Sequence, residues 1–180
     1  MMGIFYALVF FFAFVFIILP LIFLGAPFLP SYKKSETRYL DEVFNLLQEH
    51  KTRDDCKFVD LGSGDDRVVI GFAQRGYGSY GIEINPILVL ISMIKIKMAG
   101  VKNAKIIRGN FWKFDLSHFD IIYFFQYKLA NKFLERKLKN HSKNEVIIIS
   151  ACFPLKNFNL IKRVGNFYIY KNILIMKKNF

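Results

Sequence analysis

A short glycine-rich segment carries the strongest chemical signal in the sequence. Gly62-Ser63-Gly64 follows Asp60, at the end of a run of apolar residues. Glycines between a strand and a helix let the backbone approach a bound cofactor closely. Further along, Glu83 ends the second predicted strand, in Gly81-Ile82-Glu83-Ile84-Asn85-Pro86. A carboxylate at such a point can accept hydrogen bonds from both hydroxyls of a ribose, so the two features predict a site for a nucleoside-containing cofactor.

The charges around the glycines favour a sulfonium donor over a dinucleotide. The dinucleotide fingerprint G-x-G-x-x-G requires a glycine where this chain has Arg67. Asp65 and Asp66 place negative charge at the start of the next helix, where a pyrophosphate would otherwise sit. S-adenosylmethionine has no phosphate and carries a positive charge, so we predict it as the cofactor. The plain alternative is a helix cap by Asp65 or Asp66 without any ligand.

Two later segments supply the remaining candidate residues. Asn110 follows the third predicted strand and could bond the adenine edge, while Phe111 or Trp112 could stack on the base or simply pack in the core. After the fourth predicted strand, we place an acceptor pocket; no residue there stands out as a general base. The pocket candidates are Phe125, Gln126, Tyr127 and Trp112. The predicted cofactor-binding residues are Asp60, Gly62, Ser63, Gly64, Asp65, Glu83, Ile84, Asn110 and Phe111.

Alternating strand and helix patterns position these residues. Runs that are apolar on both faces indicate a parallel sheet covered by helices. Two last strands, 167–170 and 173–176, are expected to form a hairpin around Lys171-Asn172. The predicted fold is α/β, a Rossmann-like class I methyltransferase sheet with parallel strands and a C-terminal antiparallel hairpin. Its parallel strands are expected at 57–61, 79–84, 104–108, 119–125 and 145–150, and its helices at 66–75, 86–99 and 128–139.

The first part of the chain is strongly apolar. No charged residue precedes Lys33, and nearly every side chain over positions 4–24 is Phe, Ile, Leu, Val or Ala. A helix of about 20 apolar residues spans the hydrocarbon layer, so we predict an N-terminal transmembrane helix and a single-pass membrane location. Lys33, Lys34 and Arg38 follow it and place the remainder in the cytoplasm or its matrix equivalent. The predicted domains are 1–30 (anchor and linker), 31–55 (a helix packing on the domain) and 56–180 (the methyltransferase domain).

Charge and cysteine content narrow the partners. The formal net charge of +12 suits an anionic leaflet, a nucleic acid or simply solvated helix faces. The predicted anchor favours a membrane partner over nucleic acid. Cys56 and Cys152 are far apart and the three histidines are scattered, so no metal site is predicted.

The chain resembles the membrane-anchored protein-lysine methyltransferases typified by the enzymes that modify the ATP synthase c-subunit and the adenine nucleotide translocase. Order and spacing carry the resemblance up to about Pro154. The matching segments are the apolar N-terminal run, Pro27-Phe28-Leu29-Pro30-Ser31, Val59 to Arg67, Gly81 to Pro86, Asn110-Phe111-Trp112, Leu134-Glu135-Arg136-Lys137-Leu138 and Cys152-Phe153-Pro154. The chain departs from the family pattern at Asp66, Asn110, Phe125 and Cys152.

This resemblance implies an S-adenosylmethionine-dependent methyltransferase that acts on a lysine of a membrane-associated protein. The lysine must be neutral to attack, and its reference pKa of ~10.4 makes deprotonation near neutral pH cost about 4 kcal/mol. An apolar, aromatic pocket lowers that cost by disfavouring the ammonium form. Two other interpretations stay open: a methyltransferase of a membrane small molecule such as a quinone or lipid, and a degenerate methyltransferase-fold membrane scaffold without activity.

Overall fold

The computed structural model describes residues 2–18, 36–49, 56–125, 128–141 and 146–172. The chain divides into two compact units, Met1–Lys34 and Ser35–Phe180. Several predicted features lie outside the described residues: the pocket candidates Gln126 and Tyr127, the strand expected at 173–176, and the linker and basic residues over positions 25–34.

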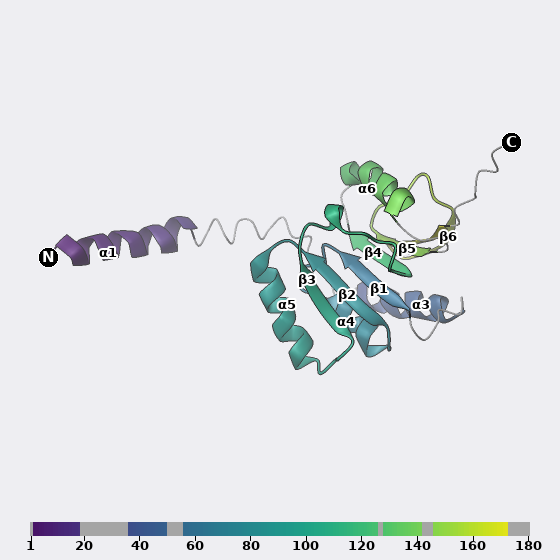
Figure 1. The fold of residues 1–180 in the computed structure, drawn as a ribbon, viewed down its shortest axis with the longest axis horizontal. Helices are drawn as coiled ribbons and strands as arrows, with labels where there is room; N and C mark the ends of the chain where they lie inside the picture. Colours follow the sequence, from purple (N-terminus) through teal and green to yellow (C-terminus); the bar gives the residue numbers. More distant parts are fainter. Residues whose placement is uncertain (1, 19–35, 50–55, 126–127, 142–145, 173–180) are drawn as a thin grey trace. The chain divides into compact units, whose positions relative to one another are not determined.

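The first unit contains helix α1 (Met2–Ala13), which continues into the π-helical turn η1 (Phe14–Ile18) (Figure 1). The prediction of a transmembrane helix over residues 4–24, and with it of a single-pass membrane location, is wrong. Within the described residues, no helix is long and apolar enough to cross a membrane. The described helical residues number 12 in α1 and 5 in η1, fewer than the roughly 20 that the hydrocarbon layer requires. The part of that prediction at residues 19–24 lies outside the described residues.

The described part of the second unit contains a seven-stranded sheet in the order β3-β2-β1-β4-β5-β7-β6. Strands β1 to β5 pair in parallel, and β7 runs antiparallel to both β5 and β6. This arrangement confirms the predicted class I methyltransferase sheet. The strands are β1 (Lys57–Leu61), β2 (Gly78–Glu83), β3 (Ala104–Arg108), β4 (Ile121–Phe125), β5 (Val146–Ala151), β6 (Leu160–Val164) and β7 (Phe167–Asn172).

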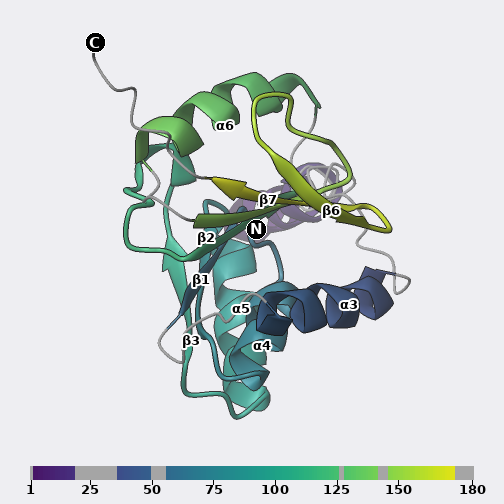
Figure 2. The same cartoon turned by 90° about the vertical axis from the view of Figure 1, so that its right-hand side faces the viewer.

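Helices cover both faces of the sheet (Figure 2). Helices α3 (Glu36–Glu49), α4 (Arg67–Gln74) and α5 (Pro86–Met98) lie on one face, and α6 (Lys128–His141) lies on the other. Successive strand residues point to opposite faces.

Two neighbouring residues of β1 show this alternation. The ring of Phe58 stacks on Phe72 of α4 with centroids 3.6 Å apart, whereas Val59 belongs to the core cluster that contains Leu134 of α6. Burial on both sides is why the parallel strands are apolar throughout.

The C-terminal hairpin was predicted at the wrong place. Its strands are β6 and β7, and its turn is Gly165-Asn166, where Gly165 has a left-handed φ of 56°. Lys171 and Asn172, the predicted turn, lie within β7 and pair with β5. Two-residue hairpin loops require positive φ, which glycine adopts readily, so Gly165-Asn166 is the better turn sequence.

Candidate functional site

The predicted site residues gather at the carboxyl edge of the parallel strands. β1 lies between β2 and β4, so the chain continues from β1 to one side of the sheet and later returns to the other. In open α/β sheets, ligands bind in the crevice outside such a reversal of strand order. Asp60 and Glu83 stand at the ends of β1 and β2, Asn110 follows β3, and Phe125 ends β4.

The glycine loop is fastened to the end of β2. Gly62 and Gly64 have φ values of 83° and 61°, in the left-handed region that favours glycine. The backbone N–H groups of Gly62 and Ser63 donate to the carbonyl oxygen of Ile82 at 2.9 and 3.2 Å. The N–H of Gly64 donates to Oε2 of Glu83 at 3.0 Å. The two segments identified separately in the sequence therefore form one structure.

Glu83 is buried, and both of its carboxylate oxygens are oriented by the backbone. Oε2 accepts from Gly64, and Oε1 accepts from the N–H of Asn85 at 2.8 Å. Asn85 also caps α5, because its side-chain oxygen accepts from the N–H of Ile87 at 2.9 Å. Each carboxylate oxygen has two acceptor positions, so two remain for the hydroxyls of a ribose. Ile84, which was also predicted to bind the cofactor, is exposed between β2 and α5.

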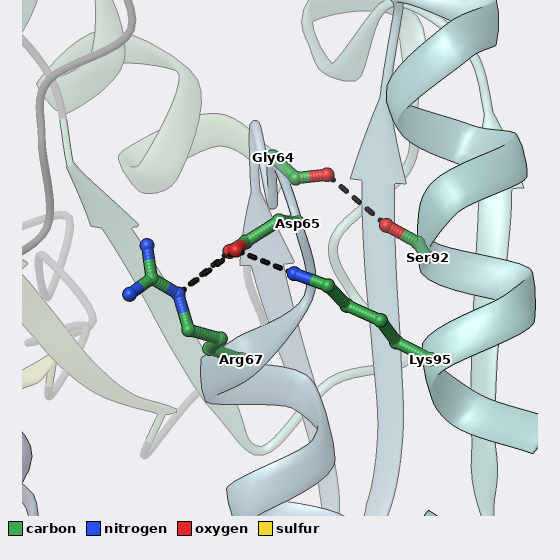
Figure 3. A network of polar contacts seen from close by, with 5 residues as sticks. All are labelled: Gly64, Asp65, Arg67, Ser92 and Lys95. Atoms are coloured by element: carbon green, nitrogen blue, oxygen red, sulfur yellow. Dashed lines mark hydrogen bonds and ion pairs between the residues drawn. The ribbon is translucent and has the colours of Figure 1, made fainter. Parts of the chain in front are cut away.

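Asp65 is engaged by two cations of its own chain (Figure 3). Lys95 of α5 donates to Oδ2 at 2.7 Å, and Nε of Arg67 donates to Oδ1 at 3.0 Å. Partial burial acts to raise the pKa of Asp65, but the hydrogen bonds from Lys95 and Arg67 outweigh it and keep this pKa below its usual range. Ser92 of α5 donates to the carbonyl oxygen of Gly64 at 3.1 Å, so α5 supports the loop at two points.

Two further carboxyl groups are buried beneath the loop. Burial raises the pKa of Asp60 well above its usual range, and the charges of Asp66, Glu83 and Asp65 add to the shift. Asp66 has no exposed surface. Burial is the largest cause that raises the pKa of Asp66 to about 6; nearby serine hydroxyls oppose it, and neighbouring carboxylates reinforce it. No group of side chains in the described part of the chain is suited to hold a metal ion.

The segment after β3 is tied to the same edge. The N–H of Gly109 donates to the carbonyl oxygen of Glu83 at 2.9 Å. Asn110 caps the short helix η2 (Phe111–Lys113), because its side-chain oxygen accepts from the N–H of Trp112 at 3.1 Å. This cap uses the amide oxygen, so the amide NH₂ is the group suited to a base edge. Phe111 packs against the core, whereas Trp112 is 39% exposed and presents more surface for stacking.

The predicted acceptor pocket is only partly described. Phe125 is half-buried at the end of β4. Gln126 and Tyr127 lie outside the described residues, so the grouping of these side chains with Trp112 stays a prediction.

Ser92, whose hydroxyl donates to the carbonyl oxygen of Gly64 in the glycine loop, was not predicted from the sequence. Ser92 is fully buried, and within α5, all of which is described, no other residue is buried. A single serine within the apolar first half of this helix, Pro86–Met93, is a signal that could have identified it.

Lys137 of α6 was noted in the sequence only as part of a segment shared with a family. Its Nζ donates to the carbonyl oxygens of Trp112 at 3.1 Å and Phe114 at 2.6 Å, and so holds the segment around η2. Burial lowers the pKa of Lys137, although Asp115 opposes the shift. Nothing in the sequence marks this lysine as pointing inward.

Sequence comparisons relate the chain to known methyltransferases. A family model described as the ANTKMT methyltransferase domain matches residues 60–162. The chain is 29% identical over 133 residues to the ATP synthase c-subunit lysine N-methyltransferase of Homo sapiens, covering 73% of this chain and 54% of that protein. It is 28% identical over 136 residues to a protein-lysine N-methyltransferase of Saccharolobus islandicus (strain REY15A), covering 74% of this chain and 80% of that protein. The chain spans about half the length of the vertebrate ATP synthase c-subunit lysine N-methyltransferases that it matches.

Solved structures share the fold. An RNA methyltransferase from Salinibacter ruber, in complex with S-adenosyl-L-homocysteine, superimposes with a TM-score of 0.65 at 24% identity, over 77% of this chain and 95% of that one. A putative methyltransferase from Escherichia coli gives a TM-score of 0.65 at 16% identity, over 80% of this chain and 89% of that one.

Proposed function

The chain belongs to the ANTKMT methyltransferase domain family, and from this premise we propose that it transfers a methyl group from S-adenosylmethionine to a lysine of a protein. Its relatives include lysine methyltransferases named for the ATP synthase c-subunit and for the adenine nucleotide translocase. We extend the proposal to a membrane-associated protein as the substrate.

The observation that carries the proposal is the orientation of Glu83. Two backbone N–H groups fix its buried carboxylate at the switch point of the sheet and leave acceptor positions for two ribose hydroxyls. The buried carboxyl group of Asp66, in its ionised form, suits a cation and would repel a pyrophosphate. The residues therefore fit S-adenosylmethionine better than a dinucleotide.

S-adenosylmethionine supplies an activated methyl group on a sulfonium, and the chain supplies position and environment. Glu83 would hold the ribose, and the NH₂ of Asn110 and the ring of Trp112 would hold the base. The apolar end of β4 around Phe125 would exclude water from the attacking lysine and favour its neutral form. Methyl transfer then depends mainly on alignment and desolvation.

Transfer of a labelled methyl group tests this proposal. The full chain is incubated with labelled S-adenosylmethionine and a membrane-containing cell extract, and the labelled products are separated into protein and lipid fractions. Acid hydrolysis of the protein fraction should yield labelled methyl-lysine. Label confined to the lipid fraction would favour a small-molecule substrate instead. Failure of S-adenosylhomocysteine to bind in calorimetry would leave a scaffold without activity.

A further inference from the structure

Asp66 is a buried acidic side chain whose own charge could contribute to the choice between ligands. Its backbone adopts the left-handed conformation, with φ 59° and ψ 21°, immediately before α4. Among the described residues, no hydrogen bond of good geometry reaches either carboxylate oxygen of Asp66 or the buried hydroxyl of Ser63. The hydroxyls of Ser63 and Ser92 lie close enough to lower the pKa of Asp66, but they do not outweigh its burial. An unpaired buried carboxylate is costly, which favours the neutral acid as long as no cation is near.

The position of this side chain is fixed by close approach to β2. A Cβ atom added to Gly81 would come within 3.0 Å of both Oδ1 of Asp66 and Oγ of Ser63. Only a glycine therefore lets the two polar groups lie against the strand. The carboxyl group of Asp66 is thus directed under the glycine loop and towards β2, away from solvent.

The groups that face Asp66 are mostly acidic. They are Asp60 from β1, Asp65 and the hydroxyl of Ser63 from the loop, Glu83 from β2, and the hydroxyl of Ser92 from α5. Asp65 is paired with Arg67 of α4 and Lys95 of α5, so those two cations are already engaged. A cation that enters the site next to Glu83 would therefore meet a surplus of negative charge.

We propose that Asp66 is a specificity-determining residue, which makes the site favour the sulfonium donor over its thioether product increasingly as the pH rises. The proposal rests on the proposed function, since it assumes that both compounds occupy the site. S-adenosylmethionine carries a sulfonium charge that S-adenosylhomocysteine lacks, and the two are otherwise closely similar. The ionised carboxylate attracts only the first of them, and by reciprocity the donor promotes loss of the proton from Asp66 to solvent. The product gives up that attraction once the methyl group has left.

Calorimetry with both compounds tests this inference on the full chain, at about pH 5 and about pH 7.5. In the unmodified protein, the ratio of the dissociation constant of S-adenosylhomocysteine to that of S-adenosylmethionine should rise roughly fivefold between the two pH values. Asp66→Asn should make the ratio nearly constant. Asparagine has the same shape and tolerates the left-handed backbone, so this variant is expected to fold. Asp66→Gly removes the side chain altogether and should behave in the same way.

A matched control removes a carboxylate elsewhere. Asp41 pairs with Arg75 at the far end of α4, and Asp41→Asn should keep the fivefold rise. The amino and carboxyl groups of the two compounds titrate alike, so their effect on binding cancels in the ratio of the two dissociation constants. Equal rises in the unmodified protein and in Asp66→Asn would overturn the inference and assign the effect to Asp60. If neither compound bound any of these folded proteins, the proposed function itself would fail, and the inference with it.

Discussion

The two halves of the carboxyl edge are built on different principles. On the β1–β2 side, the glycine loop, Glu83 and Asp65 are linked by backbone hydrogen bonds and charge-assisted contacts. On the β4–β5 side, the strands are almost entirely apolar, with the sequences IIYFF in β4 and VIIISA in β5. The hydroxyl of Ser150 donates to the carbonyl oxygen of Phe153 at 2.6 Å. Charge and fixed geometry suit recognition of one unvarying cofactor. An apolar surface suits removal of water from a neutral amine.

The largest effect should follow removal of the carboxylate of Glu83, which accepts hydrogen bonds from the glycine loop and from Asn85 at the start of α5. Glu83→Ala deletes the acceptor of two backbone N–H groups and of the proposed ribose hydroxyls. Charge-assisted hydrogen bonds are worth roughly 1.5–3 kcal/mol each, so binding of S-adenosylhomocysteine should weaken by about 100-fold. Calorimetry measures this directly. Glu83→Gln is the control for shape and should fall between the two proteins. If Glu83→Ala weakened the binding of S-adenosylhomocysteine by less than about threefold, the β1–β2 side would not be the side that binds the cofactor.

The next effect concerns stability rather than binding. Burial raises the pKa of Asp66 to about 6, above the ordinary ~3.9 of an unfolded chain. The folded protein therefore holds a proton that the unfolded chain releases, and stability is lost as the pH rises from about 4 through about 6. Asp66→Asn should raise the free energy of unfolding by about 2 kcal/mol at neutral pH and by almost nothing near pH 4. Urea titrations at the two pH values measure the difference. A gain that is the same at both would point to relief of backbone strain instead of charge.

A change on the β4–β5 side should separate turnover from cofactor binding. Phe125→Ala removes an aromatic ring from the predicted acceptor pocket and opens it to water. We expect methyl transfer to slow by about tenfold, because a solvated lysine is more readily protonated. Binding of S-adenosylhomocysteine should stay within about twofold of the unmodified protein. Phe125→Leu retains an apolar side chain and should recover much of the rate. Equal losses in turnover and cofactor binding would show that the two sides are not separate.

The same contrast explains which parts of the structure could be predicted from the sequence. Strands such as β1 and β4 are apolar on both faces, and that pattern indicated the parallel sheet. The alternation of strand and helix patterns then placed Glu83 at the end of β2. The hairpin was missed because β6 is largely exposed and carries Lys162 and Arg163, so it lacks the pattern of a buried strand. The apolar composition of the first residues was visible in the sequence, but composition alone did not show that the described helical residues would number only 12 in α1 and 5 in η1.

Within the site, the limit lies in the direction of single side chains. Asp65 and Asp66 are adjacent and of the same type, yet one pairs with Lys95 at the surface and the other is fully buried. The difference arises from the sign of one φ angle at Asp66, which turns its side chain under the loop. Residue type does not determine that angle outside glycine and proline. The role of Lys137, whose side chain reaches across to η2, was hidden for a similar reason.

The smallest effect should come from the ion pair at the border of the cofactor side. Nζ of Lys95 lies 2.7 Å from Oδ2 of Asp65, and the two side chains are 39% and 32% exposed. Exposed pairs contribute about 0.2–1 kcal/mol, so Lys95→Ala should weaken binding of S-adenosylhomocysteine by only about two- to fivefold. Because Asp65 still has Arg67 as a partner, the loop should keep its conformation.

Salt distinguishes this electrostatic contribution from a structural one. At about 1 M salt the Debye length falls to about 3 Å, and the difference between Lys95→Ala and the unmodified protein should nearly vanish. The matched control is Arg75→Ala, which removes the cation of the remote pair with Asp41 and should leave binding unchanged at any salt concentration. If the Lys95→Ala loss exceeded about tenfold and persisted in high salt, the pair would be organising the loop itself. The cofactor side would then depend on α5 as strongly as on Glu83.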